Sequence, residues 1–402
     1  MMAVSALTIL LFFISLPGFG AQAADAPDAP VIEERETLLG SLPEGESELI
    51  IHGFLSQGFL QSTENNFLPN SKNGTTDFAE AGLNFNKQLR YNLRAGLQLF
   101  ARNFGRTGNY EAKFDWFLLD YRYRDWLGLR AGRIKLPFGL YNDTSDIDAA
   151  RNSIFLPQSV YPISNRDYLL AQTGFEIYGF ADLASAGSLE YRLYRGSIEL
   201  DPSWIPGSGY EVANADVPYV HGGRLIWETP VKGLRLGASY QRLELNSDIY
   251  FPSLSKTVTG KLDVIMQVGS IEYTRPDFQL AAEYDKWWGD FQSSENTILV
   301  PASVVHERYY GRASVRLKEW LHPGVYYAVT YPNIEHKDAA KDFSKESVAF
   351  CRLDLTPNWI FKIEAHYIDG TSGLESSIND KRSVSDMPRR WQMYLAKTTV
   401  LF

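Results

Sequence analysis

Cysteine is nearly absent from this chain of 402 residues, which contains only Cys351. One cysteine excludes an intramolecular disulfide, and with it the framework that holds many small secreted domains together. Histidine is also scarce, and the six that occur show no spacing typical of metal ligands. A Gly-x-Ser-x-Gly nucleophile motif is missing as well. We therefore expect no cofactor, no metal site and no catalytic residue.

Long hydrophobic runs are missing after residue 23. Because a spanning helix needs about 18 or more apolar residues, a helical membrane protein is excluded. The chain does begin with an uncharged apolar segment, followed by Ala21, Gln22 and Ala23, the small-x-small pattern of a signal-peptidase site. We predict a cleaved signal peptide over residues 1–23. The lack of Lys and Arg before the apolar run leaves an uncleaved anchor as the alternative.

Positive charge is scarce in the segment 24–48, which has eight acidic residues and only Arg35 as a base. This segment accounts for most of the net charge of −9, so the rest of the chain is nearly neutral. Its acidic, aromatic-poor composition is typical of a flexible segment, which we place in the periplasm. We predict no nucleic-acid partner.

Alternation with a period of two residues dominates the remaining sequence. In residues 89–102 the odd positions are apolar, whereas the even positions include Arg90, Arg94 and Arg102. If the apolar face meets lipid, the arginines face water. The opposite orientation would cost about 2 to 4 kcal/mol for each arginine near the membrane midplane. A soluble sheet with one face on a core produces the same alternation, so period alone does not decide between them.

Connection lengths separate the two possibilities. Short turns are predicted at 87–88, 124–126, 182–187, 229–233, 275–277, 318–323 and 356–358. Long polar connections are predicted at 62–76, 103–109, 137–168, 196–218, 246–261, 289–303, 332–345 and 370–389. Short and long connections alternate, which predicts about eight hairpins with every long loop at one end, as in outer-membrane barrels.

The carboxyl-terminal residues 394–402 alternate from Tyr394 to a terminal Phe402. This ending resembles the assembly signal of outer-membrane barrels, which implies the barrel-assembly machinery as a partner. The sequence therefore predicts an all-β fold: a transmembrane antiparallel up-and-down β-barrel of about 16 strands over residues 49–402. The barrel is expected in the outer membrane of a Gram-negative bacterium, in contact with lipid and lipopolysaccharide.

Basic residues are frequent on the polar strand faces that would line the lumen. A barrel of this size encloses an aqueous channel, so these side chains are candidates for its wall. The candidates are Arg94, Arg312, Arg316, Arg352 and Lys362. They predict a wall that attracts anions, unless they pair with nearby acids and only set the width of the pore.

The longest connection, 137–168, is too apolar for a solvated tether because it contains Ile154, Phe155, Leu156, Val160 and Tyr161. A loop of this length is typically functional or disordered. We predict that it folds into the lumen and narrows the pore, with a cap on the barrel or a subunit contact as alternatives. Its charged residues would then face the basic wall. They are Asp143, Asp146, Asp148, Arg151 and Arg166.

The segment 130–141, with Gly132-Arg133, Lys135 and Pro137-Phe138-Gly139, resembles the strand that enters the constriction loop in phosphate-selective and dicarboxylate-type porins. The resemblance implies a homotrimer, an anion-preferring constriction, and pore-facing Arg133 and Lys135. Arg130 has the opposite parity to both, so we expect a bulge at Ala131-Gly132.

The predicted function is a diffusion porin that passes small hydrophilic, anionic solutes. Two other classes stay open: an outer-membrane barrel enzyme, in which a residue such as His366 acts as a base, and a secreted or periplasmic all-β binding protein.

Overall fold

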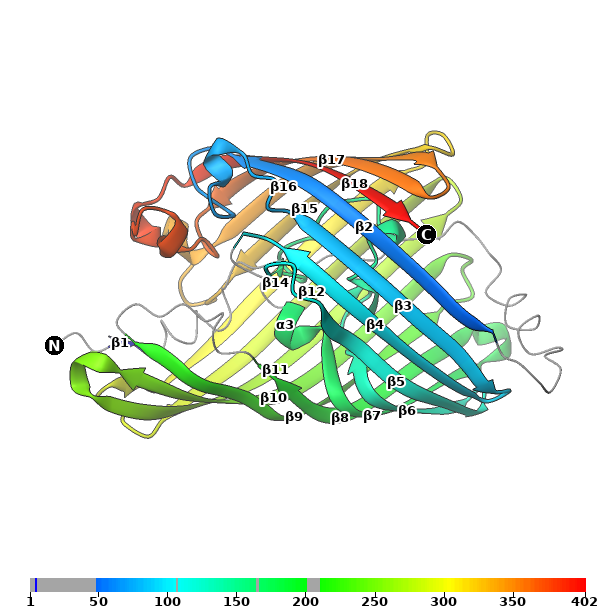
Figure 1. Ribbon diagram of the computed structural model, residues 1–402, viewed down its shortest axis with the longest axis horizontal. Coiled ribbons are helices and arrows are strands. Elements are labelled where there is room, and N and C mark those ends of the chain that lie inside the picture. Colours follow the sequence, from blue (N-terminus) through cyan, green and yellow to red (C-terminus); the bar gives the residue numbers. More distant parts are fainter. Residues whose placement is uncertain (1–3, 6–47, 106–107, 164–165, 201–209) are drawn as a thin grey trace.

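The structure, a computed structural model, describes residues 4–5, 48–105, 108–163, 166–200 and 210–402. Sixteen strands form one closed barrel, in which each strand pairs antiparallel with its neighbours in the chain and β18 closes on β2 (Figure 1). The predicted fold class is confirmed. The predicted cleavage site, and the predicted acidic segment except Glu48, lie outside the described residues.

The barrel strands are β2 (Leu49–Ser62), β3 (Ala79–Arg90), β4 (Leu93–Asn103), β5 (Lys113–Arg124), β6 (Leu127–Lys135), β7 (Ala171–Asp182), β8 (Ser188–Glu199), β9 (Glu211–Glu228), β10 (Leu234–Phe251), β11 (Lys256–Arg275), β12 (Phe278–Ser293), β14 (Ala302–Val315), β15 (Leu321–Tyr331), β16 (Ser344–Thr356), β17 (Trp359–Gly370) and β18 (Arg390–Leu401). Two short strands, β1 (Val4–Ser5) and β13 (Leu299–Val300), pair in parallel outside the barrel. The α-helix α3 covers Arg166–Leu169. In the described part of the chain, no helix has the length and apolar character to cross a membrane.

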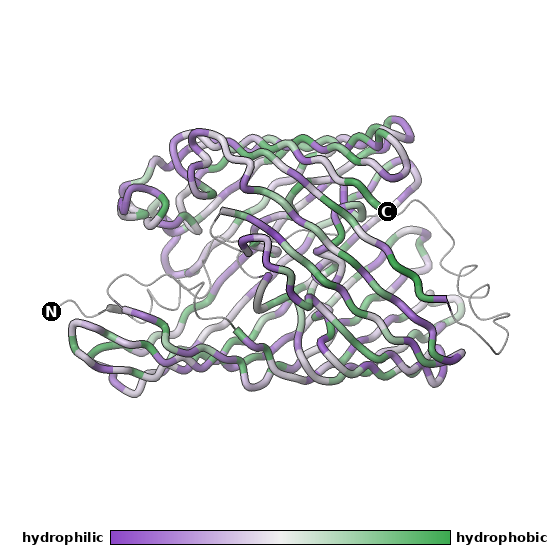
Figure 2. Tube along the Cα trace, in the orientation of Figure 1, coloured by the Kyte–Doolittle hydropathy of each residue, from purple (hydrophilic) through white to green (hydrophobic). Residues whose placement is uncertain are grey.

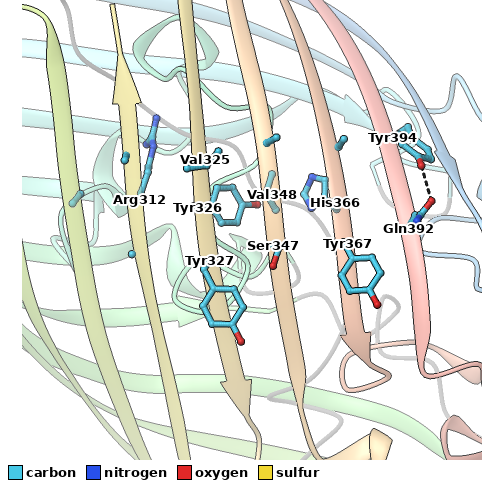
Figure 3. Close-up of a pocket in the computed structure, with 15 residues that line it drawn as sticks. Arg312, Val325, Tyr326, Tyr327, Ser347, Val348, His366, Tyr367, Gln392 and Tyr394 are labelled. Carbon is cyan, nitrogen blue, oxygen red and sulfur yellow. Dashed lines mark hydrogen bonds between the residues drawn. The ribbon is translucent and has the colours of Figure 1, made fainter.

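Residues alternate between the two faces of the wall as predicted, a pattern visible along the strands in Figure 2. On β15, Tyr326 is 3% exposed and faces the interior, whereas Tyr327 is 47% exposed on the outside (Figure 3). An outer depression of about 720 Å³ is lined by small residues and tyrosines, among them Gly311, Ala313, Ala349, Ala365, Tyr327, Tyr367 and Tyr394. Apolar outer and polar inner side chains are the arrangement of a membrane-spanning barrel.

Two predicted connections are wrong in position. The turn expected at 87–88 lies at Tyr91 and Asn92, between β3 and β4. A two-residue turn alone would reverse the parity of the faces, but the register shift between Gln88 and Arg90 restores it, so the apolar alternation continues through the turn without a visible break. The loop expected at 246–261 is instead mostly strand, because β10 and β11 pair from Leu234 and Tyr273 up to Phe251 and Lys256.

The bulge expected at Ala131-Gly132 is also wrong, because β6 keeps a continuous register there with both β5 and β7. Gly132 instead adopts a φ of 132°. A Cβ atom at this position would lie 2.3 Å from the carbonyl oxygen of Phe117, so only glycine fits. The register shift in this region occurs one strand away, where β4 and β5 skip Asp115.

Candidate pore constriction

The described residues of the connection between β6 and β7, 136–163 and 166–170, lie inside the barrel (Figure 1). We call this connection the constriction loop. Near its start the backbone N–H of Leu140 donates to Glu283 of β12 at 2.8 Å. Further along, the backbone N–H groups of Ile154 and Phe155 donate to the Glu364 carboxylate of β17. The loop is rooted on β6 and β7, which are separated from β12 by four strands and from β17 by five strands, so contacts with both strands carry the loop across the lumen.

The apolar residues of the constriction loop form two buried clusters with the wall. Ile154 and Phe155 pack in one cluster with Trp391 and Met393 of β18. Leu156, Val160 and Tyr161 belong to a second cluster with wall residues of β14 to β16, including Tyr310, Tyr326 and Phe350. These side chains explain why a connection of this length is ordered inside an otherwise polar channel.

Asp148 is the centre of a buried charge cluster that ties the loop to β17 and β18. Its carboxylate lies 2.7 Å from Arg151, 3.2 Å from Lys362 and 3.0 Å from Lys397. Thr399 donates a fourth contact at 2.7 Å. Burial alone would raise the pKa of the Asp148 carboxyl, but Lys362 and Lys397 hold it well below its usual range.

The other loop charges pair with the wall nearer the root of the loop. Asp143 contacts Arg192 and lies 3.1 Å from Arg224, both on the inner wall. Asp146 contacts Lys135 at the end of β6. These bases outweigh desolvation and lower the pKa values of both carboxyls. One pair has the opposite polarity, with the base on the loop and the acid on the wall: Arg166 of α3 lies 2.7 Å from Asp115.

The remaining sequence-predicted wall residues fall into two groups. Three of them have partners: Arg94 lies 3.2 Å from Asp120, Arg352 lies 2.8 Å from Asp354, and Nε of Arg133 donates to the Asp115 carbonyl oxygen at 2.9 Å. Arg312 instead lies over the Phe350 ring, and its Nε and Nη2 have no hydrogen-bond partner. Nε of Arg316 has none either.

Sequence reasoning overlooked Lys397 and Asp115. Lys397 lies in the carboxyl-terminal segment that was interpreted as an assembly signal and was therefore not considered as a wall residue. Its parity is opposite to that of the outward Tyr394, which indicates an inward side chain. Asp115 sits at the register shift of β5, where alternation fails. His366, the candidate base, lies between Glu346 at 2.6 Å and Glu364 at 2.8 Å as a buried wall histidine. Among the described residues no group of three or more side chains is arranged to hold a metal ion.

Strong acid is expected to release the constriction loop. The folded-state pKa values of Asp143, Asp146 and Asp148 lie below the usual value of 3.8. The stabilisation that these ionised carboxylates give to the docked loop is therefore complete above about pH 4. It is lost as the pH falls through their lower folded-state pKa values. Single-channel conductance should stay constant between about pH 8 and 5 and rise below about pH 3. A rise already above pH 5 would contradict this assignment.

Comparison with solved structures identifies outer-membrane proteins that share this fold. The chain is similar to outer-membrane OmpT of Vibrio cholerae, with 10% identity, a TM-score of 0.58, and coverage of 90% of this chain and 99% of that one. It is also similar to an anion-selective porin from Comamonas acidovorans, at 11% identity and a TM-score of 0.54, covering 89% of this chain and 100% of the other.

The fold is that of a porin. The outer membrane channel DcaP of Acinetobacter baumannii is similar too, at 10% identity and a TM-score of 0.51, with 90% and 99% of the two chains covered. No protein-family model matches the chain, and no curated protein matches it in sequence. At these identities the similarity shows a shared porin fold, but it does not indicate which solute passes through this chain.

Proposed function

We propose that the chain is an outer-membrane porin, a water-filled channel for passive diffusion of small hydrophilic solutes with a preference for anions, and that it acts without catalysis. The observation that supports this proposal most strongly is the constriction loop, which the buried Asp148 cluster holds across the lumen. Barrels of about sixteen strands leave an aqueous channel. A loop fixed across such a channel sets the size of the solute that passes.

The anion preference rests on Arg312 and Arg316. The loop carboxylates Asp143, Asp146 and Asp148 are each neutralised by a base. In the part of the chain that the structure describes, neither Arg312 nor Arg316 forms an ion pair, and both carry buried N–H groups without acceptors. Unpaired arginines on the wall, beside a loop whose carboxylates are neutralised, attract anions.

The orientation of the channel in the membrane is inferred from the position of the two chain ends on the barrel. The carbonyl oxygen of Phe402 accepts from Gly53, so the start of β2 and the end of β18 share the end with short turns. We place this end, and the acidic segment 24–48, in the periplasm after cleavage at Ala23. The proposal includes insertion by the barrel-assembly machinery and a homotrimer; one similar structure of Vibrio cholerae OmpT is a trimer form.

Liposome swelling tests diffusion directly. Proteoliposomes of the mature protein should swell in small sugars at rates that fall steeply with sugar size, because the constriction loop limits the cross-section. Liposomes that contain correctly folded protein but do not swell in any sugar would refute the channel.

Replacing Arg312 by alanine is expected to reduce the chloride-to-potassium permeability ratio roughly twofold, because it removes an unpaired positive charge from the lumen wall. Reversal potentials in a salt gradient measure this ratio. Arg242→Ala is the control, since Arg242 lies on the outer face and pairs with Asp263. Equal reversal potentials for the wild type and Arg312→Ala would remove Arg312 from the selectivity determinants.

A further inference from the structure

A cavity of about 100 Å³ lies between the constriction loop and the barrel wall. We call it the loop-wall cavity. The loop contributes Gln158, Ser159, Pro162 and Ile163 to its lining, and each of the strands β14 to β18 contributes inward residues. Because one water molecule needs about 10 to 15 Å³ of such space, the loop-wall cavity has room for several waters or for one small solute. None of its described lining residues belongs to the Asp148 cluster.

The loop-wall cavity opens toward the long-connection end of the barrel. Its partly exposed lining residues include Phe67 and Ser372, in the long connections after β2 and β17, and Thr330 near the end of β15. Other lining residues are buried, among them Ser159 at 2% and His306 at 1% exposure. A solute in the outer part of the channel can therefore enter the loop-wall cavity from its partly exposed side.

Two buried polar side chains on opposite sides of the loop-wall cavity have unmet hydrogen-bonding capacity. Within the described part of the chain, neither ring nitrogen of His306 has a hydrogen-bond partner, and the hydroxyl oxygen of Ser159 has none. Buried polar groups in folded proteins nearly always have partners. A neutral imidazole offers one donor and one acceptor, and a hydroxyl both donates and accepts. These groups therefore require a molecule in the cavity that can donate as well as accept.

The charges that line the loop-wall cavity are of both signs. Arg308 of β14 and Glu346 of β16 are its charged lining residues. Arg308 is opposite Asp285 of β12 in register, and Glu346 lies 2.6 Å from His366. Because the lining carries no excess of either sign, it is complementary to a neutral solute rather than to an anion.

We infer that the loop-wall cavity binds one small neutral polyol of about the size of glycerol. Its hydroxyl groups donate to and accept from His306 and Ser159, and its carbon atoms contact the apolar lining residues Ile368, Leu374 and Trp391. The inference rests on the proposed channel function, because the solute arrives through the channel. It adds a neutral solute class to the anions that the arginines of β14 attract.

Saturation-transfer NMR with glycerol tests this inference on the folded mature protein. The protein is held in micelles of lauryldimethylamine oxide, a detergent without hydroxyl groups. Glycerol should receive saturation from the protein, whereas 1-propanol should bind about tenfold more weakly because it has a single hydroxyl group. Sorbitol should not compete with glycerol, because it is too large for a cavity of about 100 Å³. Acetate should not compete either.

The substitution Ser159→Ala should weaken glycerol binding about fivefold, since it removes one hydrogen bond and hardly changes the volume. The matched control is Ser303→Ala, because Ser303 lies on the exposed outer face of β14 and donates to Asp290 at 2.8 Å. His306→Leu should weaken binding about tenfold, because both ring nitrogens are lost. Heat-modifiable gel mobility establishes that each variant is a folded barrel.

The outcomes separate the inference from the function on which it rests. Absence of saturation transfer to glycerol from a protein that conducts chloride means that water alone fills the cavity, which overturns the inference and leaves the channel intact. Displacement of glycerol by acetate overturns the neutral solute class. Equal glycerol affinity of the wild type and Ser159→Ala places binding elsewhere and also overturns the inference. Absence of any current from folded protein overturns the channel itself. If His306→Leu does not fold, Ser159→Ala and the wild-type ligand series still decide.

Discussion

Asp148→Ala is expected to release the constriction loop and to raise the single-channel conductance, with frequent transitions between current levels. The substitution leaves Lys362, Lys397 and Arg151 buried around a missing carboxylate. Removing one partner of a buried ion pair typically costs about 3 to 5 kcal/mol. This cost falls on loop docking, because the barrel strands retain their own hydrogen-bond ladders.

Single-channel recordings of Asp148→Ala and of Asp380→Ala form the matched comparison. The Asp380 side chain is 81% exposed in the connection after β17, and its nearest basic partner is 3.8 Å away, so its removal should not alter the current. Heat-modifiable gel mobility establishes that both variants are folded barrels. A folded Asp148→Ala channel with wild-type conductance and noise would show that the Asp148 cluster does not hold the loop.

Removal of the middle of the constriction loop, residues 142–163, with a short Gly-Ser joint is expected to increase conductance severalfold. It should also admit sugars that the wild type excludes. The deleted segment contains the buried side chains Ile154, Phe155 and Leu156, which occupy the lumen next to the wall. Without them the cross-section is set by the barrel alone.

Liposome swelling with sugars of increasing size measures this change in the limiting diameter. Deletion of residues 335–338, in the connection between β15 and β16, is the control because that connection contributes no residue to the Asp148 cluster. An unchanged size limit after deletion of residues 142–163 would mean that another part of the barrel forms the narrowest point.

The barrel was predictable from sequence because two independent patterns agree, alternation within strands and alternation of connection lengths. Alternation reports which face a residue occupies but does not reveal a two-residue turn that is joined to a bulge. Leu89, Tyr91 and Leu93 keep one parity through the turn between β3 and β4 because the register shift between Gln88 and Arg90 compensates for it. For this reason the turn was predicted at 87–88 rather than at Tyr91 and Asn92, where it lies.

The extended hairpin of β10 and β11 escaped prediction for a different reason. Residues 246–261 resemble a polar loop because the outward side chains of this hairpin meet water rather than lipid. The inward Ile249 and Val258 were the signal that remained, and they indicate a strand only when the outer face is allowed to be polar. Local sequence does not state where a strand leaves the membrane.

The constriction loop was predictable in location but not in its pairing. Its length and its apolar residues pointed into the lumen, whereas the partners of its charges depend on distant parts of the chain. Asp148, for example, contacts Lys397, which is 249 residues away. Such contacts come from closure of the barrel between β18 and β2, which no local pattern contains.

Single-channel recording of the mature wild-type protein in a planar bilayer tests the central claim most directly. The account predicts discrete current steps that are linear at low voltage, with a reversal potential in a salt gradient that favours chloride over potassium. Absence of steps from protein shown to be folded by heat-modifiable mobility would contradict the water-filled channel.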